Sequence, residues 1–189
     1  MHPEVEHLIE AWHWMYFEAD LVFGGLQEDN LHRRPAPGLL AVSEHAAHLA
    51  RSEASIVNRY LFGQLPELPL APMNGGERGL GGEGSSGWAD CLFRRAEFGW
   101  PPTMLEGPVN PDLAKLSVAE VFEQLTVQHL RCYELARTLA LSPDHEFDDD
   151  WPRIRTVRDR LRIAAYHVAY HMGQIYSVRH LLGEETPEN

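Results

Sequence analysis

Hydrophobic residues recur at steps of three and four positions in four segments of this 189-residue chain. This spacing is typical of amphipathic helices that turn one face to a core. The first two segments run from about 3 to 27 and from about 41 to 62, and the last two from about 117 to 141 and from about 156 to 182. No segment shows the sustained alternation of apolar and polar residues that indicates strands. The pattern therefore predicts an all-α fold.

Local signals mark the ends of the later segments. Ser117 followed by Glu120 forms the sequence signature of a capping box, in which the two side chains satisfy free amides at a helix start. Thr156 is the expected N-cap of the fourth helix, and Gly183 is expected to end it. Four amphipathic helices of this length are best accommodated in an up-down four-helix bundle.

A long stretch without helical periodicity, residues 63–116, separates the second and third predicted helices. It contains a glycine-rich tract at 75–87, which should be flexible because glycine carries much backbone entropy, and a short possible helix at 88–98. We interpret the chain as one domain, 1–189, in which 63–116 is an insertion between helices two and three.

The composition of the chain limits the classes of partner that it is expected to bind. The chain has 16 Lys and Arg against 28 Asp and Glu, a formal net charge of −12, which repels phosphate backbones and anionic lipid surfaces. No apolar run approaches the roughly 18 residues needed to span a bilayer, and residues 1–6 lack a basic leader. Cys91 and Cys132 are too few and too far apart for a disulfide framework. We expect a cytoplasmic protein that binds neither nucleic acid nor membrane.

The most informative pair of residues is His167 and His171 in the fourth predicted helix. Residues four apart lie on the same helix face, so both imidazoles can reach one divalent metal. The alternative is a pair of hydrogen-bonded interior histidines. Burying two imidazoles without a metal or other partners would leave ring nitrogens unsatisfied, which is costly. We therefore favour metal ligation.

A third ligand is expected from the second predicted helix, where His48 lies beside the apolar stripe. His45, one turn earlier, is the rival ligand. His129 falls on the apolar stripe of the third helix and is interpreted first as a core histidine, with a fourth ligand or a supporting group as alternatives. A three-histidine site leaves coordination positions open, which favours chemistry or ligand binding over a structural role.

Other polar residues near these histidines are less decisive. Arg51 and Ser52 follow His48 by about one turn and could orient a substrate, although a solvated helix face explains them equally well. Gln174 could hold a ligand or a water. Glu53 points about 140 degrees away from His48 on a helical wheel and is expected to be a supporting or surface group. The stripe of Trp12, Tyr16 and Phe17 is expected to be core packing.

At these residues the chain resembles the DinB-like superfamily of metal-binding four-helix bundles. The resemblance rests on the stretches 42–50 and 167–175 and on Arg179 to Gly183, and it covers nearly the whole chain. It implies a metal held by His48, His167 and His171, a homodimer, and transfer or isomerisation chemistry with thiols such as bacillithiol or mycothiol. Ala41, where a Ser or Thr cap is common, and the long insertion depart from the family pattern.

The resulting hypothesis is a divalent metal bound by three neutral imidazoles, zinc by ligand type, with nickel, iron or manganese as alternatives. The metal would activate a low-molecular-weight thiol for attack on a small electrophilic substrate, as in a thiol S-transferase. The second hypothesis is a metal-dependent hydrolase. The third hypothesis is a metal- or ligand-binding bundle without catalysis. No catalytic residue is assigned.

Overall fold

The computed structural model describes residues 1–63, 107–148 and 153–186. The described chain is helical, which confirms the all-α prediction, and its β-structure is limited to one isolated bridge between Glu146 and Thr156. In order, the helices are α1 (Pro3–Trp14), α2 (Phe17–Phe23), α3 (Glu28–Leu31), α4 (Val42–Ala54), the π-helix η1 (Ser55–Leu61), the 3₁₀ helix η5 (Leu113–Lys115), α5 (Val118–Ala136) and α6 (Val157–Leu181).

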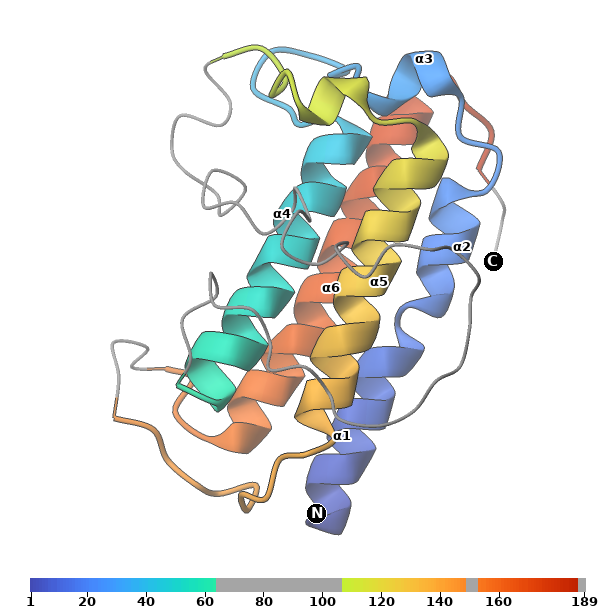
Figure 1. Ribbon diagram of the computed structural model, residues 1–189. Coiled ribbons are helices and arrows are strands. Elements are labelled where there is room, and N and C mark those ends of the chain that lie inside the picture. Colours follow the sequence, from blue (N-terminus) through green and yellow to red (C-terminus); the bar gives the residue numbers. More distant parts are fainter. Residues whose placement is uncertain (64–106, 149–152, 187–189) are drawn as a thin grey trace, which may run out of the picture.

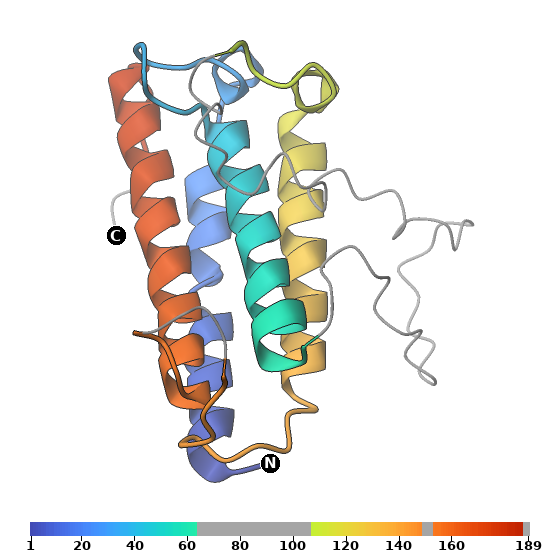
Figure 2. The same cartoon turned by 90° about the vertical axis from the view of Figure 1, so that its left-hand side faces the viewer.

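The long helices form a bundle in which α4 packs against both α5 and α6, and α1 packs against α6 (Figure 1). The helices α1 and α2 also contact α5, which closes the ring. Both views show that α4 and α5 run in the same direction, opposite to α1 and α6 (Figure 2). The direction therefore alternates between α1 and α4 and between α5 and α6, whereas α4 and α5 run parallel to each other.

The first predicted helix is divided into α1 and α2 at Met15 and Tyr16. The amides of these two residues donate to carbonyls three positions earlier, at 3.2 Å and 3.0 Å, instead of the usual four. Such tightening is typical of a short 3₁₀ turn at a helix end. Helix α2 ends at Phe23, and Gly25 then takes a φ of 69°, a conformation that glycine adopts without strain.

The second predicted helix is continuous, but its last part, η1, has π-helical hydrogen bonding. At its end the amide of Phe62 donates to the carbonyl of Val57, five residues back, at 3.2 Å. Within it the side chain of Asn58 donates to the carbonyl of Ala54 at 2.9 Å. The apolar periodicity of the sequence did not predict this change. The π-helical segment begins only after Ala54, so the pattern before it is that of an ordinary α-helix.

The predicted caps are present. The hydroxyl of Ser117 accepts from the amide of Glu120, and that of Thr156 accepts from the amide of Asp159. Ala41 has no capping oxygen, yet Glu44 supplies half of the box, because its Oε2 accepts the amide of Ala41 at 2.9 Å. The absence of a Ser or Thr at position 41 is thus partly offset. Gly183 ends α6 with a φ of 83°, as predicted.

The core lies between the helices, where the apolar stripe of α6 faces that of α1 and α4. The end of the expected insertion also contributes to it, since Leu113 of η5 is fully buried. Cys132 is fully buried, and its sulfur accepts from the side-chain amide of Gln128 at 3.2 Å. Among the described residues, no helix is both long and apolar enough to cross a membrane.

Three of the predictions concern residues outside the described ranges. They are the glycine-rich tract at 75–87, the short helix at 88–98 and the thiol of Cys91.

Packing on α5 predicts a clear contrast between two leucines of this helix. Leu125 is fully buried, whereas Leu130 is 49% exposed. We expect Leu125→Ala to lower the free energy of unfolding by about 2–5 kcal/mol, because it removes buried surface and leaves a cavity. The matched control Leu130→Ala should change it by less than about 1 kcal/mol. Urea unfolding followed by circular dichroism measures both, and equal losses would contradict the assigned faces of α5.

Candidate metal centre

Three histidines from two helices meet where α4 packs against α6. His48 comes from the middle of α4, and His167 and His171 come from successive turns of α6. One ring nitrogen of each lies within 4.8 Å of the corresponding atoms of the other two. The ring centroid of His48 lies 5.4 Å from that of His167 and 4.8 Å from that of His171. The structure therefore brings these three predicted residues into one cluster.

The two histidines of α6 are the closer pair. Their Nε2 atoms are 3.0 Å apart, and their rings are nearly perpendicular, at 73°. Two nitrogens bound at about 2.0–2.1 Å to one tetrahedral zinc ion would be about 3.3 Å apart. Only a small opening of this pair is needed to reach that spacing. The i,i+4 geometry of α6 thus suits a single metal ion.

Burial keeps the imidazoles of α6 in the neutral form that binds metals. His171 is 2% exposed, and burial, followed by the nearby histidines His167, His48 and His45, lowers its pKa to about 2. Burial also lowers the pKa of His167, although Glu53 acts in the opposite direction. Metal ligation requires a deprotonated ring nitrogen, so these shifts remove the competition from protons at neutral pH.

Buried ring nitrogens around the cluster lack partners in the described chain. The Nδ1 atoms of His45 and His167 are both inaccessible to water and form no hydrogen bond with described residues. Leaving such groups unsatisfied costs about 1–3 kcal/mol each, so they normally have a partner. The nitrogens that converge are those of His48, His167 and His171, which lie within 4.8 Å of one another, and neutral imidazole nitrogens are ligands that suit a divalent cation. The residues present therefore fit such a cation.

Polar groups surround the cluster on both helices. The hydroxyl of Ser52 lies 3.3 Å from Nε2 of His48, and Arg51 is buried on the same helix, with 7% exposure. On α6 the side-chain amide of Gln174 donates to the hydroxyl of Tyr170 at 3.1 Å. Arg51 is therefore not the solvated residue that the sequence allowed. Ser52 thus contacts the cluster directly, and Arg51 and Gln174 lie within about one turn of its histidines along their own helices.

The two rival ligands have different positions. His45 is buried beside the cluster, and its ring centroid lies 5.7 Å from that of His171. It is nevertheless outside the group whose nitrogens converge. Burial lowers its pKa to about 4, against the effect of Glu44, so it too is neutral. His129 lies elsewhere, on α5, where it is 1% exposed and stacks on Tyr16.

Sequence reasoning missed the part played by Glu53, which is not a surface group. Its side chain is completely buried on the side of α4 that faces α1 and α5. It accepts hydrogen bonds from Trp12 Nε1 at 2.6 Å, from the hydroxyl of Tyr16, and from Nδ1 of His129 at 3.3 Å. Trp12 and Tyr16 are buried as expected, but Phe17 is 41% exposed and is not core packing.

Comparison with known proteins agrees with this arrangement of helices and histidines. A family model described as the DinB superfamily matches residues 11–175, a span that includes α4, α5 and all three clustered histidines. No curated protein and no solved structure gives a significant match. Since the matched span covers most of the chain and runs from α1 into α6, this protein belongs to the DinB superfamily.

Proposed function

We propose that His48, His167 and His171 bind one divalent metal, and that the protein uses it to join a low-molecular-weight thiol to a small electrophile. The observation that carries this proposal is the convergence of the three ring nitrogens where α4 meets α6. Membership of the DinB superfamily supports it. Three protein ligands are typical of catalytic zinc sites, whereas structural sites usually have four.

Imidazole ligands favour zinc, and they also suit nickel, iron and manganese. Neutral imidazoles add no negative charge, so the full charge of the cation would act on whatever else binds there. When bound, such a cation lowers the pKa of a coordinated thiol or water and so supplies a nucleophile near neutral pH. Burial of His171 and His48 would exclude bulk water from one side of the site.

The chain's own groups would position the reactants. The hydroxyl of Ser52 can donate a hydrogen bond to a molecule held beside His48, because it lies within 3.3 Å of that ring. The guanidinium of Arg51 would attract a carboxylate or phosphate group on the thiol or on its partner. Gln174 is tied to Tyr170 and can present its amide from the α6 side. These are positioning roles.

A thiol is the preferred nucleophile because the resemblance implies thiols such as bacillithiol or mycothiol. Water is the alternative, and it would make the protein a metal-dependent hydrolase. A bundle that binds a metal or a small ligand without catalysis is the non-enzymatic alternative. A homodimer and a cytoplasmic location also remain predictions.

Metal content tests the ligand set. Protein purified without a histidine tag should carry close to one divalent ion per chain, as measured by elemental mass spectrometry. We expect His48→Ala, His167→Ala and His171→Ala each to lower the affinity by at least about 100-fold, because each removes one of three ligands. His180→Ala, an exposed residue of the same helix α6, is the matched control and should leave the content unchanged.

His45→Ala separates the rival arrangements. It should retain the metal, because its ring lies beside the cluster and does not converge with it. If His45→Ala loses the metal while His48→Ala keeps it, the assignment of the α4 ligand is wrong.

Removing the metal should destabilise the fold. A ligand that binds only the native state stabilises it by about 2.7 kcal/mol at a free concentration of 100 times Kd. We therefore expect the melting temperature to fall by several degrees on chelation and to recover when zinc is added back. The variant His171→Ala should show a low melting temperature that is insensitive to the chelator. An unchanged wild-type value, with metal loss verified, would contradict the coupling between metal and fold.

Activity distinguishes the enzymatic alternatives. Bacillithiol, mycothiol, glutathione and water are compared as nucleophiles against a panel of small electrophiles, with product formation followed by mass spectrometry. The metal-loaded protein should conjugate at least one thiol at a rate about 100-fold or more above that of His171→Ala.

Turnover with water alone would replace the transferase with a hydrolase. If no nucleophile reacts faster than with His171→Ala, yet a small molecule raises the melting temperature, the protein is a binding module.

A further inference from the structure

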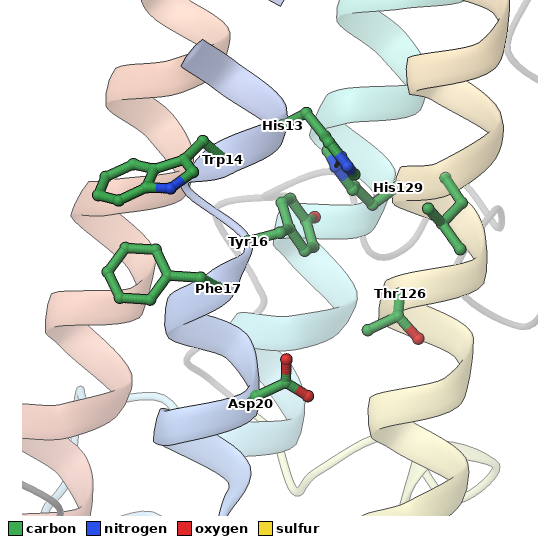
Figure 3. Close-up of a pocket in the computed structure, with 8 residues that line it drawn as sticks. His13, Trp14, Tyr16, Phe17, Asp20, Thr126 and His129 are labelled. Atoms are coloured by element: carbon green, nitrogen blue, oxygen red, sulfur yellow. Dashed lines mark hydrogen bonds between the residues drawn. The ribbon is translucent and has the colours of Figure 1, made fainter. Parts of the chain in front are cut away.

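A second recess lies away from the histidine cluster, where α1 and α2 face α5. It is a pocket of about 340 Å³ (Figure 3). This volume is at the lower end of the range for small-molecule sites, about 300–1,000 Å³. Its described lining contains none of the three clustered histidines and includes His13, Trp14, Phe17, Asp20 and His129. The recess is therefore separate from the proposed metal centre.

A chain of hydrogen bonds connects this pocket with the buried carboxylate of Glu53. Nδ1 of His129 lies 3.3 Å from Glu53 Oε1, and Nε2 of His129 lies 2.8 Å from Nδ1 of His13. A carboxylate only accepts, so in the arrangement with two neutral rings the proton next to Glu53 lies on Nδ1 of His129. In that arrangement Nε2 of His129 accepts and Nδ1 of His13 donates. The carboxylate and the two rings thus form one hydrogen-bonded chain that ends at the recess.

With its proton on Nδ1, a neutral His13 has a lone pair on Nε2, which is able to accept a hydrogen bond. Burial, followed by the influence of His129, lowers the pKa of His13 and favours this neutral form at pH 7. Its ring is held in place by stacking on Tyr133, with centroids 4.0 Å apart at 17°. His13 is only partly buried and lines the pocket. It therefore offers an oriented acceptor to a molecule in the recess.

The opposite wall is aromatic and largely open to solvent. Trp14 is 63% exposed and Phe17 is 41% exposed, and their ring centroids are 4.5 Å apart. In Figure 3 these two rings lie on one side of Tyr16, and His13 and His129 lie on the other. Large exposed aromatic groups next to a recess are a common feature of ligand sites. A flat ring could bury this surface by stacking.

Charge restricts the ligand further. Asp20 is exposed and is the sole carboxylate among the described residues that line the recess. None of these described residues is a Lys or Arg. An anion would be repelled by Asp20, while a positively charged or strongly donating group would be attracted.

We infer that this pocket binds a small, flat heteroaromatic base that is neutral or singly positive and carries N–H donors. One N–H donates to Nε2 of His13, the ring stacks on Trp14 and Phe17, and the positive end lies near Asp20. The site is independent of the metal and adds a binding function to a second face of the bundle. Glu53 acts as a positioning residue, since it reaches His13 through His129 and does not itself line the recess.

Calorimetric titration of the full-length, metal-loaded protein with 2-aminobenzimidazole tests this inference, because this probe is a flat cation with several N–H donors. We expect saturable one-to-one binding. Indole-2-carboxylate, an anion of similar size, should bind at least about tenfold more weakly. Asp20→Asn should weaken binding of the cation about threefold to tenfold, and Asp29→Asn, an exposed aspartate of α3, should not change it.

Replacement of His13 tests the acceptor. His13→Phe keeps a ring that can stack on Tyr133 but lacks Nε2, and it should weaken binding about tenfold. His7→Phe, at an exposed position of α1, is its control. In the wild-type protein the ring nitrogens of His13 and His129 should shift in nitrogen-15 spectra as the probe is added. Because Asp20 is exposed, its variant remains informative even if His13→Phe fails to fold.

An azole can also bind a metal directly, so His171→Ala is titrated in parallel and should bind the probe as the wild-type protein does. Loss of binding in His171→Ala with full binding in His13→Phe would place the probe on the metal and overturn the inference. Absence of saturable binding to the folded wild-type protein would overturn it as well. Equal affinity for the cation and the anion would show that the assigned ligand class is wrong.

Discussion

The arrangement of this bundle depends on the hydrogen bonds that the buried side chain of Glu53 accepts. A carboxyl group without solvent exposure is stable only when its oxygens have hydrogen-bond partners. Trp12, Tyr16 and His129 provide them from α1, from the residue that precedes α2, and from α5. The division of the first helix at Met15 and Tyr16 belongs to the same arrangement, because Tyr16, one of the two donors from this part of the chain, lies in the tightened turn. One side chain of α4 therefore binds three parts of the protein together.

The same anchor determines where the histidines of α4 point. His48 and Glu53 are five positions apart, which separates them by about 140 degrees around the helix axis. With Glu53 held toward α1 and α5, His48 has to face α6, where His167 and His171 lie. Two buried polar residues of α4 thus have different partners: Glu53 accepts from donors within the core, and His48 converges with the histidines of α6. Deleting Glu53 would accordingly disturb the position of His48.

The sequence predicted the features that depend on local periodicity and capping. The helical segments, the caps at Ser117 and Thr156, and the end of α6 at Gly183 follow from rules that act within one turn. The shared face of His167 and His171 has the same origin. Features that depend on neighbours were not predictable in this way. A helical wheel gave the direction of Glu53 relative to His48, but it could not show that two aromatic donors and a histidine fill that direction.

The division of the first helix and the π-helix η1 are further examples. Both change hydrogen bonding over a few residues without breaking the apolar pattern, so periodicity carries no sign of them. They nevertheless decide which side chains meet. The turn at Met15 and Tyr16 places exposed Trp14 and Phe17 beside a recess whose other wall ends in His13 and His129. The carboxylate that accepts hydrogen bonds in the core is also connected through His129 to His13 at the recess, so the packing of the bundle and its second face are linked through Glu53.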